Sequence, residues 1–454
     1  MKFVFLLSLR NLVLHWNRHI LTMIGLITGM TGIILFGGYV LRMEGYLGTN
    51  SIFLRHVGHV SLLKKDAYLN YQQNPSKYSF DLTEQNAILE VLQSPSIKIN
   101  RLIPVVATQA MLSSGCQNFP VWVQGIRSDD MNWIYSHTEV QKQIPELARM
   151  HSGQGYWNSN NVLAATTSPT LWGFLDKDPL DSITEDSRKT AEGILNCDDP
   201  ATNGKLKHTN DLQLYSQDFY GGFGLVDTTV SGLKYSGFSL IDEVFYIAPL
   251  ELVQNLVKSD NIYKWALYFE DTTNLSKKIS ELKESLKEKN IDNIDLIPYR
   301  DARVSALYVG NMTFVLIMFL FFLVLICGVV ILTVFNSLQI AFLERKKDIS
   351  IYKSIGFRNT IITQIFQVEY FLISLAACVI SGFIGVWAAQ WNNSMNFRFQ
   401  LPGYSSTLQF RLEPSTAYIF FVFAFMILLI QLVSYFQIRR ILQQQSTDLM
   451  RLDS

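Results

Sequence analysis

Four stretches of the chain lack Asp, Glu, Lys and Arg over a length that can cross a bilayer. They are residues 20–41, 304–343, 370–397 and 414–438. A helix needs roughly 20 mostly apolar residues to span a hydrocarbon core of about 30 Å. Only 17% of the 454 residues are charged, and these charges are segregated into blocks. The pattern predicts a polytopic α-helical membrane protein with four transmembrane helices.

Basic residues in the short connections set the expected orientation. Lys and Arg are enriched before the first span, between the second and third spans, and after the fourth. We therefore expect both termini in the cytoplasm and a large domain outside. The expected segments are a cytoplasmic N-terminal helix (1–19), TM1 (20–41), the external domain (42–303), a stalk and TM2 (304–343), a cytoplasmic loop (344–361), TM3 (362–390), an external loop (391–413), TM4 (414–438) and a cytoplasmic tail (439–454).

The first residues resemble a signal peptide only superficially. Arg10 interrupts the apolar run and no small-residue cleavage site follows. Phe3, Phe5, Leu6 and Leu9 instead favour a retained amphipathic helix along the membrane surface.

The external domain is predicted to be α+β. Alternating hydrophobicity predicts strands at 57–63, 102–112, 121–126, 244–248, 264–269 and 294–298. Helices are expected after a cap at Thr83 and at 275–286, the second within a strand–helix–strand unit. A polar, Asp-rich stretch at about 176–210 is interpreted as a loop or insertion. Cys116 and Cys197 lie in this domain, and they either form a disulfide, which an oxidising compartment permits, or stay as thiols.

Signatures of common catalytic sites are missing from the sequence. It contains no GxxxxGK[ST] phosphate loop, HExxH, CxxC or GxSxG. His56 and His59 are expected on opposite faces of a strand, and the GGFG at 221–224 is interpreted as a turn. Zero net charge argues against nucleic-acid binding. Glu369 is the one carboxylate within a span, and we interpret it as a structural or coupling residue rather than a proton relay.

The cytoplasmic loop is the most informative segment. Charges at 344–348 end the second span, and Ile349, Ile351, Tyr352 and Ile355 are expected to form an apolar stripe before a helix stop at Gly356. Such a short helix is suited to docking a soluble subunit. The residues expected to take part are Glu344, Arg345, Lys346, Lys347, Asp348, Ile349, Ile351, Tyr352, Lys353, Ile355 and Gly356.

This loop, LERKKDISIYKSIG, resembles the segment between the second and third spans of the FtsX-like/MacB permease family. The layout of one span, a large external domain and three further spans is also similar, as are Glu369 and the third-span glycines Gly382 and Gly385. In the first span, Gly25, Gly29 and Gly32 include a GxxxG that favours close helix packing.

The resemblance implies a permease of a mechanotransmission-type ABC transporter that is not itself an enzyme. No cofactor is expected in this chain, because ATP and Mg²⁺ would bind a separate dimeric ATPase. The other implied partners are a second permease copy or paralogue, membrane lipids, and a periplasmic cargo or acceptor protein. The implied location is the bacterial inner membrane.

Two features narrow the choice within the family. No ATPase domain is expected to be fused at the N-terminus, and the predicted external domain is far larger than that of FtsX proteins. It is most similar to the lipoprotein-releasing (LolC/LolE) type. Two alternatives remain open: an efflux permease that works with a periplasmic adaptor, and a scaffold that activates an external cell-wall hydrolase.

Overall fold

The computed structural model describes residues 2–14, 16–93, 98–183 and 206–452. The chain divides into two compact units. Unit 1 contains Met1–Glu44, Thr313–Arg398 and Gln409–Ser454, and unit 2 contains Gly45–Met312 and Phe399–Leu408. Because α2 and α15 cross the unit boundaries, each of these helices contributes residues to both units.

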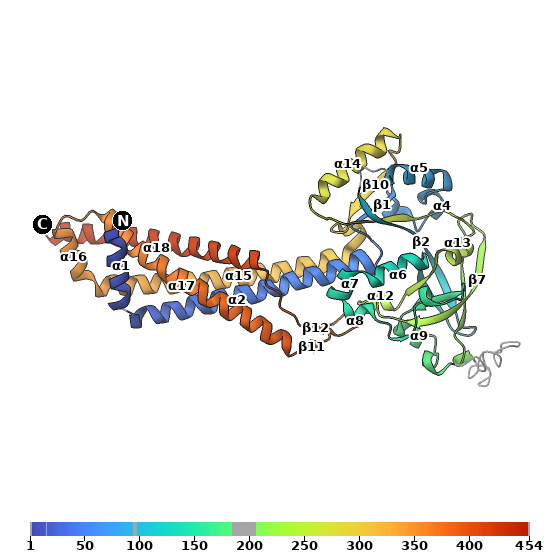
Figure 1. Ribbon diagram of the computed structural model, residues 1–454, viewed down its shortest axis with the longest axis horizontal. Coiled ribbons are helices and arrows are strands. Elements are labelled where there is room, and N and C mark those ends of the chain that lie inside the picture. The colour runs from blue at the N-terminus through green and yellow to red at the C-terminus, as the bar shows by residue number, and fades with distance from the viewer. Residues whose placement is uncertain (1, 15, 94–97, 184–205, 453–454) are drawn as a thin grey trace. The chain divides into compact units, whose positions relative to one another are not determined.

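Unit 1 is helical. Its elements are α1 (Lys2–Leu14), α2 (Trp16–Thr49), α15 (Ala302–Glu344), α16 (Lys346–Ser354), α17 (Asn359–Ser394) and α18 (Thr416–Leu452). Within the described residues, α2, α15, α17 and α18 are long and apolar enough to cross a membrane. In this unit they run side by side around a common apolar core (Figure 1). The four predicted membrane helices are thus present, and α1 packs against α17.

Helix α1 packs against the bundle with a side that includes both Ser8 and the apolar Leu12. The Ser8 hydroxyl is buried and donates a hydrogen bond to the Ile365 carbonyl oxygen (2.9 Å). Phe5, Leu6 and Leu9 are exposed. This arrangement suits a helix that has protein on one side and lipid on the other.

Unit 2 is rich in β-structure. The strands of its large sheet are β1 (Val60–Lys64), β2 (Ile99–Ser113), β3 (Asn118–Ile126), β4 (Ser152–Gly153), β5 (Ala164–Thr167), β6 (Asp211–Gln217), β7 (Phe223–Leu233), β8 (Phe245–Pro249), β9 (Lys264–Phe269) and β10 (Ile294–Pro298). They pair in the order β10-β1-β9-β2-β3-β8-β5-β7-β4, and β6 joins β2 to β7. Strands β2, β3, β8, β5, β7 and β6 therefore pair in a closed circuit.

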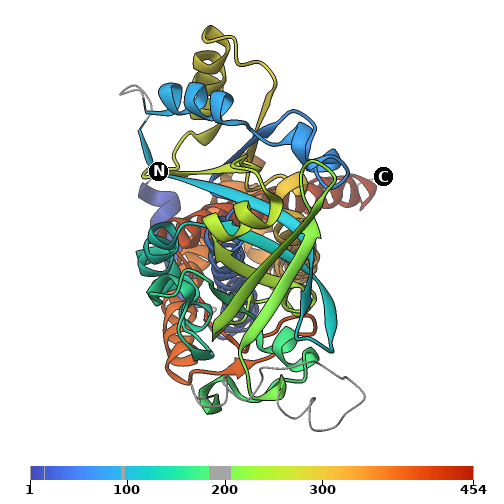
Figure 2. The same ribbon diagram turned by 90° about the vertical axis from the view of Figure 1, so that its right-hand side faces the viewer.

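Helices cover these strands, and the described core of unit 2 consists of two large apolar clusters and a small one. Helices α5 (Leu82–Leu92) and α14 (Leu275–Glu288) cover β1 and β9 and share one apolar core with them (Figure 2). Helix α13 (Leu250–Val257) belongs to a separate core within the closed circuit. The remaining helices are short: α3 (Ala67–Asn70), α4 (Pro75–Tyr78), α6 (Ser128–Ser136), α7 (Thr138–Gln143), α8 (Pro145–Ala148), α9 (Pro169–Phe174) and α12 (Ser239–Asp242).

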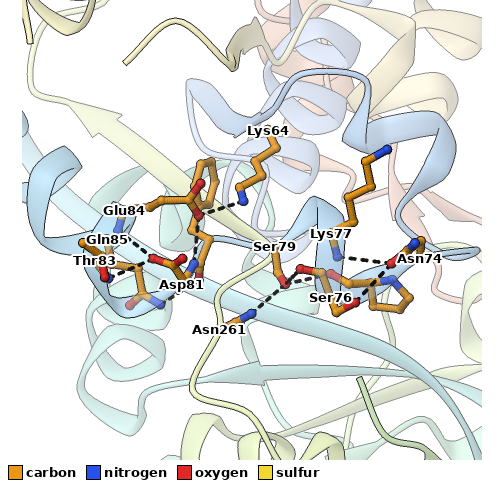
Figure 3. A network of polar contacts seen from close by, with 12 residues as sticks. Lys64, Asn74, Ser76, Lys77, Ser79, Asp81, Thr83, Glu84, Gln85 and Asn261 are labelled. Carbon is orange, nitrogen blue, oxygen red and sulfur yellow. Dashed lines mark hydrogen bonds and ion pairs between the residues drawn. The ribbon is translucent and has the colours of Figure 1, made fainter. Parts of the chain in front are cut away.

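The sequence analysis predicted the helix cap at Thr83, two residues after its actual position at Asp81. Asp81 is the N-cap of α5, and its Oδ1 accepts hydrogen bonds from the backbone N–H groups of Thr83 and Glu84 (Figure 3). The Glu84 carboxylate in turn accepts a bond from the Asp81 N–H (3.0 Å) and pairs with Lys64 Nζ (2.7 Å). This reciprocal capping box satisfies the free N–H groups at the helix start.

The polar insertion and the cysteine pair are only partly described. Residues 184–205 lie outside the described residues, and Cys197 is among them. Cys116 is disulfide-bonded, but its pairing with Cys197 stays a prediction. At the described edges, Lys177 Nζ donates hydrogen bonds to the carbonyl oxygens of Leu206 (2.6 Å) and Thr209 (3.0 Å). These bonds join the two ends of the insertion.

Both long helices are distorted where they enter unit 2. Helix α2 ends in a π-helical turn at Asn50–Leu54, and α15 has a non-helical backbone at Ser305. The hydroxyl groups of Ser51 and Ser305 lie 2.6 Å apart, and Tyr268 Oη donates a hydrogen bond to the Ile52 carbonyl oxygen (3.1 Å). The outer ends of the two helices are therefore bonded to each other and to β9.

The sequence analysis predicted that His56 and His59 are strand residues. This prediction is wrong, because both residues precede β1. His56 is fully buried, and its Nδ1 lies 2.9 Å from Gln124 Oε1. His59 Nδ1 accepts a hydrogen bond from the Phe269 N–H (3.0 Å). Burial lowers the pKa of His56 to about 3 and that of His59 to about 4. Within the described residues, no group of three or more His, Cys, Asp or Glu could hold a metal.

These two histidines predict that unit 2 loses stability in mild acid. Below pH 6.5 the unfolded chain binds protons that the folded histidines do not bind until about pH 3–4. The free energy of unfolding should therefore fall by up to about 1.4 kcal/mol per pH unit for each histidine. The measurement is urea unfolding of the full chain from pH 7 to pH 4. His56→Gln should reduce this slope, whereas replacing the exposed His151 with Gln should not; equal slopes would contradict the assignment.

Candidate functional site

The site forms around a buried ion pair in unit 1. Arg345, at the junction of α15 and α16, donates from Nη1 to Glu369 Oε2 (2.8 Å) and from Nη2 to Oε1 (3.0 Å). His19 Nε2 of α2 lies 2.8 Å from the same Oε1. The Glu369 and His19 side chains are fully buried, and that of Arg345 is 5% exposed. Glu369 of α17 thus contacts charged or ionisable groups from two other segments.

The chain turns sharply at Arg345. Its backbone departs from helical geometry (φ −95°, ψ 15°), and it is the N-cap of α16. The Ile349 N–H donates a hydrogen bond to the Arg345 carbonyl oxygen (2.9 Å), which closes the first turn of α16. The nine-residue helix ends at Ser354, and Gly356 follows in the left-handed region (φ +95°). Glycine adopts this conformation without the penalty of a Cβ, so the sequence stops the helix there.

The single apolar stripe expected on α16 does not exist. Ile349 is only 2% exposed and packs in the core of unit 1 with Phe342, Ile362 and Phe366, and Tyr352 packs partly against the same core. Arg345, expected at the docking surface, is also buried. An apolar stripe with a period of 3.6 residues can face the protein's own core, which is what Ile349 and Tyr352 do.

The opposite face of α16 is exposed. Ile351 is 53% exposed and Ile355 68% exposed. Lys347, Ser350 and Ser354 are also exposed, and their spacing places them on the same side of the helix as the two isoleucines. We define the α16 outer face as Lys347, Ser350, Ile351, Ser354 and Ile355. The remaining predicted loop residues are exposed or half-buried around it: Glu344, Lys346, Asp348, Lys353 and Gly356.

Helix α17 connects this site to the other long helices through polar contacts. Tyr370 Oη donates a hydrogen bond to Ser337 Oγ of α15 (2.9 Å), and Thr22 Oγ1 of α2 donates to the same oxygen (2.7 Å). Gln367 Nε2 donates to the Gln431 carbonyl oxygen of α18 (3.1 Å). One turn of α17 therefore contacts α2, α15 and α18 around Glu369.

The predicted packing glycines lie against neighbouring helices. A Cβ added at Gly25 would lie 3.1 Å from Thr333 of α15, and one at Gly29 would lie 3.2 Å from Ile326 and Val330. At Gly32 the nearest atom, of Ile326, is 3.6 Å away. A Cβ at Gly382 would come within 2.6 Å of Phe423 in α18, and one at Gly385 within 2.9 Å of Ile34 in α2. Small residues thus permit close approach along three helix pairs.

His19 was missed by the sequence reasoning, and so were the partners of Glu369. His19 directly precedes the first charge-free stretch, and Arg345 is the second residue after the second stretch. Ionisable residues next to a span commonly act as interfacial anchors, so the positions of His19 and Arg345 alone do not indicate an ion pair. The one sequence feature that indicates a partner for them is the Glu369 carboxylate within the third span.

Comparison with known proteins gives one family match. Residues 304–446 match the model described as FtsX-like permease C-terminal, a region that includes Arg345, α16 and Glu369. No curated protein sequence matches the chain.

The solved structures with limited similarity to the chain include two domains of ABC-type transporters. The extracellular domain of the noncanonic ABC-type transporter YknZ from Gram-positive bacteria is 11% identical, with a TM-score of 0.31 over 52% of this chain and 98% of that one. The periplasmic region of MacB from Actinobacillus actinomycetemcomitans is 11% identical, with a TM-score of 0.30 over 54% of this chain and 92% of that one.

Proposed function

The chain carries an FtsX-like permease domain over residues 304–446, and we propose that it is the membrane subunit of a mechanotransmission-type ABC transporter. The α16 outer face binds a separate ATPase. The observation that carries this proposal is that α16 is fixed to the bundle by buried Arg345 and Ile349 and yet exposes Ile351 and Ile355. A helix fixed on one side can transmit a push that it receives on the other.

The proposed path of motion follows the contacts of Glu369. A displacement of α16 moves Arg345, and the bidentate ion pair transfers it to α17. The contact with His19 involves α2 as well. Because α2 and α15 continue into unit 2 and are bonded to each other there, movement of these helices reaches the β-rich unit.

The orientation belongs to the same proposal. In this proposal α16 and both termini lie in the cytoplasm, which the basic residues Lys346, Lys347 and Lys353 favour. Unit 2 then lies outside the inner membrane. The proposed cargo is a lipoprotein or another amphiphile taken from the outer leaflet. In support, the carboxylate of Glu369 is engaged by Arg345 and His19, which disfavours a role as an ion or proton carrier.

Docking is tested with aspartate variants of the α16 outer face. Ile351→Asp and Ile355→Asp should weaken association with the ATPase by at least about 100-fold, because each variant removes apolar burial and places a charge in the interface. The readout is the amount of ATPase that co-purifies with the tagged chain from native membranes in mild detergent. Val162→Asp, at a residue 78% exposed in unit 2, is the matched control. Wild-type recovery of the ATPase with both α16 variants would refute the proposal.

A further inference from the structure

An open groove lies on the outer side of the β3–β2–β6–β7 sheet in unit 2. In this sheet Met111 pairs with Pro120 of β3 and with Tyr215 of β6. Tyr215 pairs in turn with Leu225 of β7. Directly paired residues point to the same face, so these side chains share one surface. The alternate residues, among them Leu112 and Leu214, are buried in the core on the other face.

The groove is apolar where a solvent-facing sheet is usually polar. Its volume is about 860 Å³, and its lining includes Met111, Pro120, Trp122, Tyr215 and Phe223 without a charged side chain. Phe223 is 63% exposed. This volume lies within the range of about 300–1,000 Å³ that is typical of ligand sites, whose walls are mostly hydrophobic and aromatic.

A second, polar hollow of about 380 Å³ adjoins the groove and shares Gln109, Trp122 and Gln217 with it. The loop before α4 contributes the amides Gln72, Gln73 and Asn74. Side-chain amides and hydroxyls can donate to and accept from peptide groups. Together the two hollows form one continuous site with an apolar half and an amide-rich half.

Asp218 is the one charged side chain that lines the described part of the polar hollow. Its Oδ1 accepts hydrogen bonds from the N–H groups of Tyr220 (2.9 Å) and Gly222 (2.7 Å), and Lys258 Nζ lies 3.5 Å from its Oδ2. These contacts hold the GGFG turn and largely neutralise the carboxylate. Lys258 Nζ also donates a hydrogen bond to the Phe223 carbonyl oxygen (2.7 Å), so this cation is already engaged by Asp218 and by the backbone. Among the described residues no other charged side chain lines either hollow, so a phosphate there would have no cation of its own.

We propose that this groove binds the acylated end of a lipopeptide, with an acyl chain along Met111, Tyr215 and Phe223 and the peptide against the amides. Charge complementarity selects this occupant, because an anionic phospholipid headgroup would be desolvated without a cationic partner. The proposal rests on the proposed function, since it assigns the class of cargo to a site in the external unit. Binding itself requires no ATPase.

The test is photocrosslinking on the full chain in phosphatidylcholine nanodiscs. The probe is a diacylglyceryl-cysteine peptide with uncharged side chains and a diazirine in one acyl chain, and the comparison probe is phosphatidylglycerol with the same diazirine. We expect labelling of peptides from β2 and β6 that excess unlabelled lipopeptide displaces. Phe223→Asp should weaken binding about tenfold. Leu240→Asp, 71% exposed on α12, is the matched control and should change binding less than twofold.

The outcomes separate this proposal from the docking proposal. Ile355→Asp should bind the probe like the wild type even where it loses the ATPase. Labelling confined to the membrane helices, equal labelling by phosphatidylglycerol, or unchanged binding by Phe223→Asp would each overturn the lipopeptide site and leave ATPase docking untouched.

Discussion

Replacing Glu369 with glutamine is expected to lower the free energy of unfolding of the purified chain by about 3–5 kcal/mol. The substitution keeps the size of the side chain but leaves the Arg345 guanidinium buried without its counter-ion. A buried charge without a partner lowers the free energy of unfolding by far more than an exposed ion pair raises it. Thermal unfolding in detergent measures the effect.

Two variants make this result specific. Glu344→Gln makes the same chemical change at an exposed position one residue before Arg345, and should alter stability by less than about 0.5 kcal/mol. Combining Arg345→Met with Glu369→Gln should recover much of the lost stability, because the double variant no longer buries an unpaired charge. If Glu369→Gln unfolds at the same temperature as Glu344→Gln, the ion pair does not hold the bundle together.

The second large effect is expected at Gly58, where the chain leaves the π-helical turn of α2 and approaches β1. Its φ of +69° costs a residue with a side chain about 1–2 kcal/mol. A Cβ would also lie 2.7 Å from the backbone nitrogen of Leu267 and 2.9 Å from its oxygen, both within β9. Gly58→Ala should therefore destabilise unit 2 by roughly 2–5 kcal/mol, since backbone in a central strand has little freedom to move.

Gly173→Ala provides the comparison for Gly58. Gly173 lies within α9, and nothing stands within 4 Å of its added Cβ. This variant should be neutral or stabilising by up to about 1 kcal/mol. Urea unfolding and limited proteolysis of the full chain measure both variants. Equal stability of the two would show that β9 can shift to accept the methyl group.

The membrane helices and most strands could be predicted because each produces a local, periodic signal. Charge-free runs mark α2, α15, α17 and α18, alternation marks β3, and β9 is a short, mostly apolar run that is buried on both faces. Strand β6 alternates equally well, with Leu212 and Leu214 inward, but it lies at the end of a polar stretch that was interpreted as insertion. The cap at Asp81 was also visible, since Glu84 follows it by three residues.

The long-range contacts of the site could not be predicted. Arg345 and Glu369 lie 24 residues apart in the sequence, and His19 lies in another helix. Nothing local in the sequence states which basic residue beside a span turns inward. The periodicity of α16 likewise predicted an apolar stripe without stating which isoleucines it contains. Ile349 faces the core because the turn at Arg345 fixes the rotation of the helix.

The most direct test of ATPase docking at α16 is a photoreactive amino acid at Ile355. The full chain carrying p-benzoylphenylalanine there is irradiated in native membranes, and the crosslinked partner is identified by mass spectrometry. We predict an ABC ATPase as the crosslinked protein, with no such product from the same group placed at Val162. An Ile355 crosslink to lipid or to a protein without an ATPase domain, and none to an ATPase, would contradict the docking function of α16.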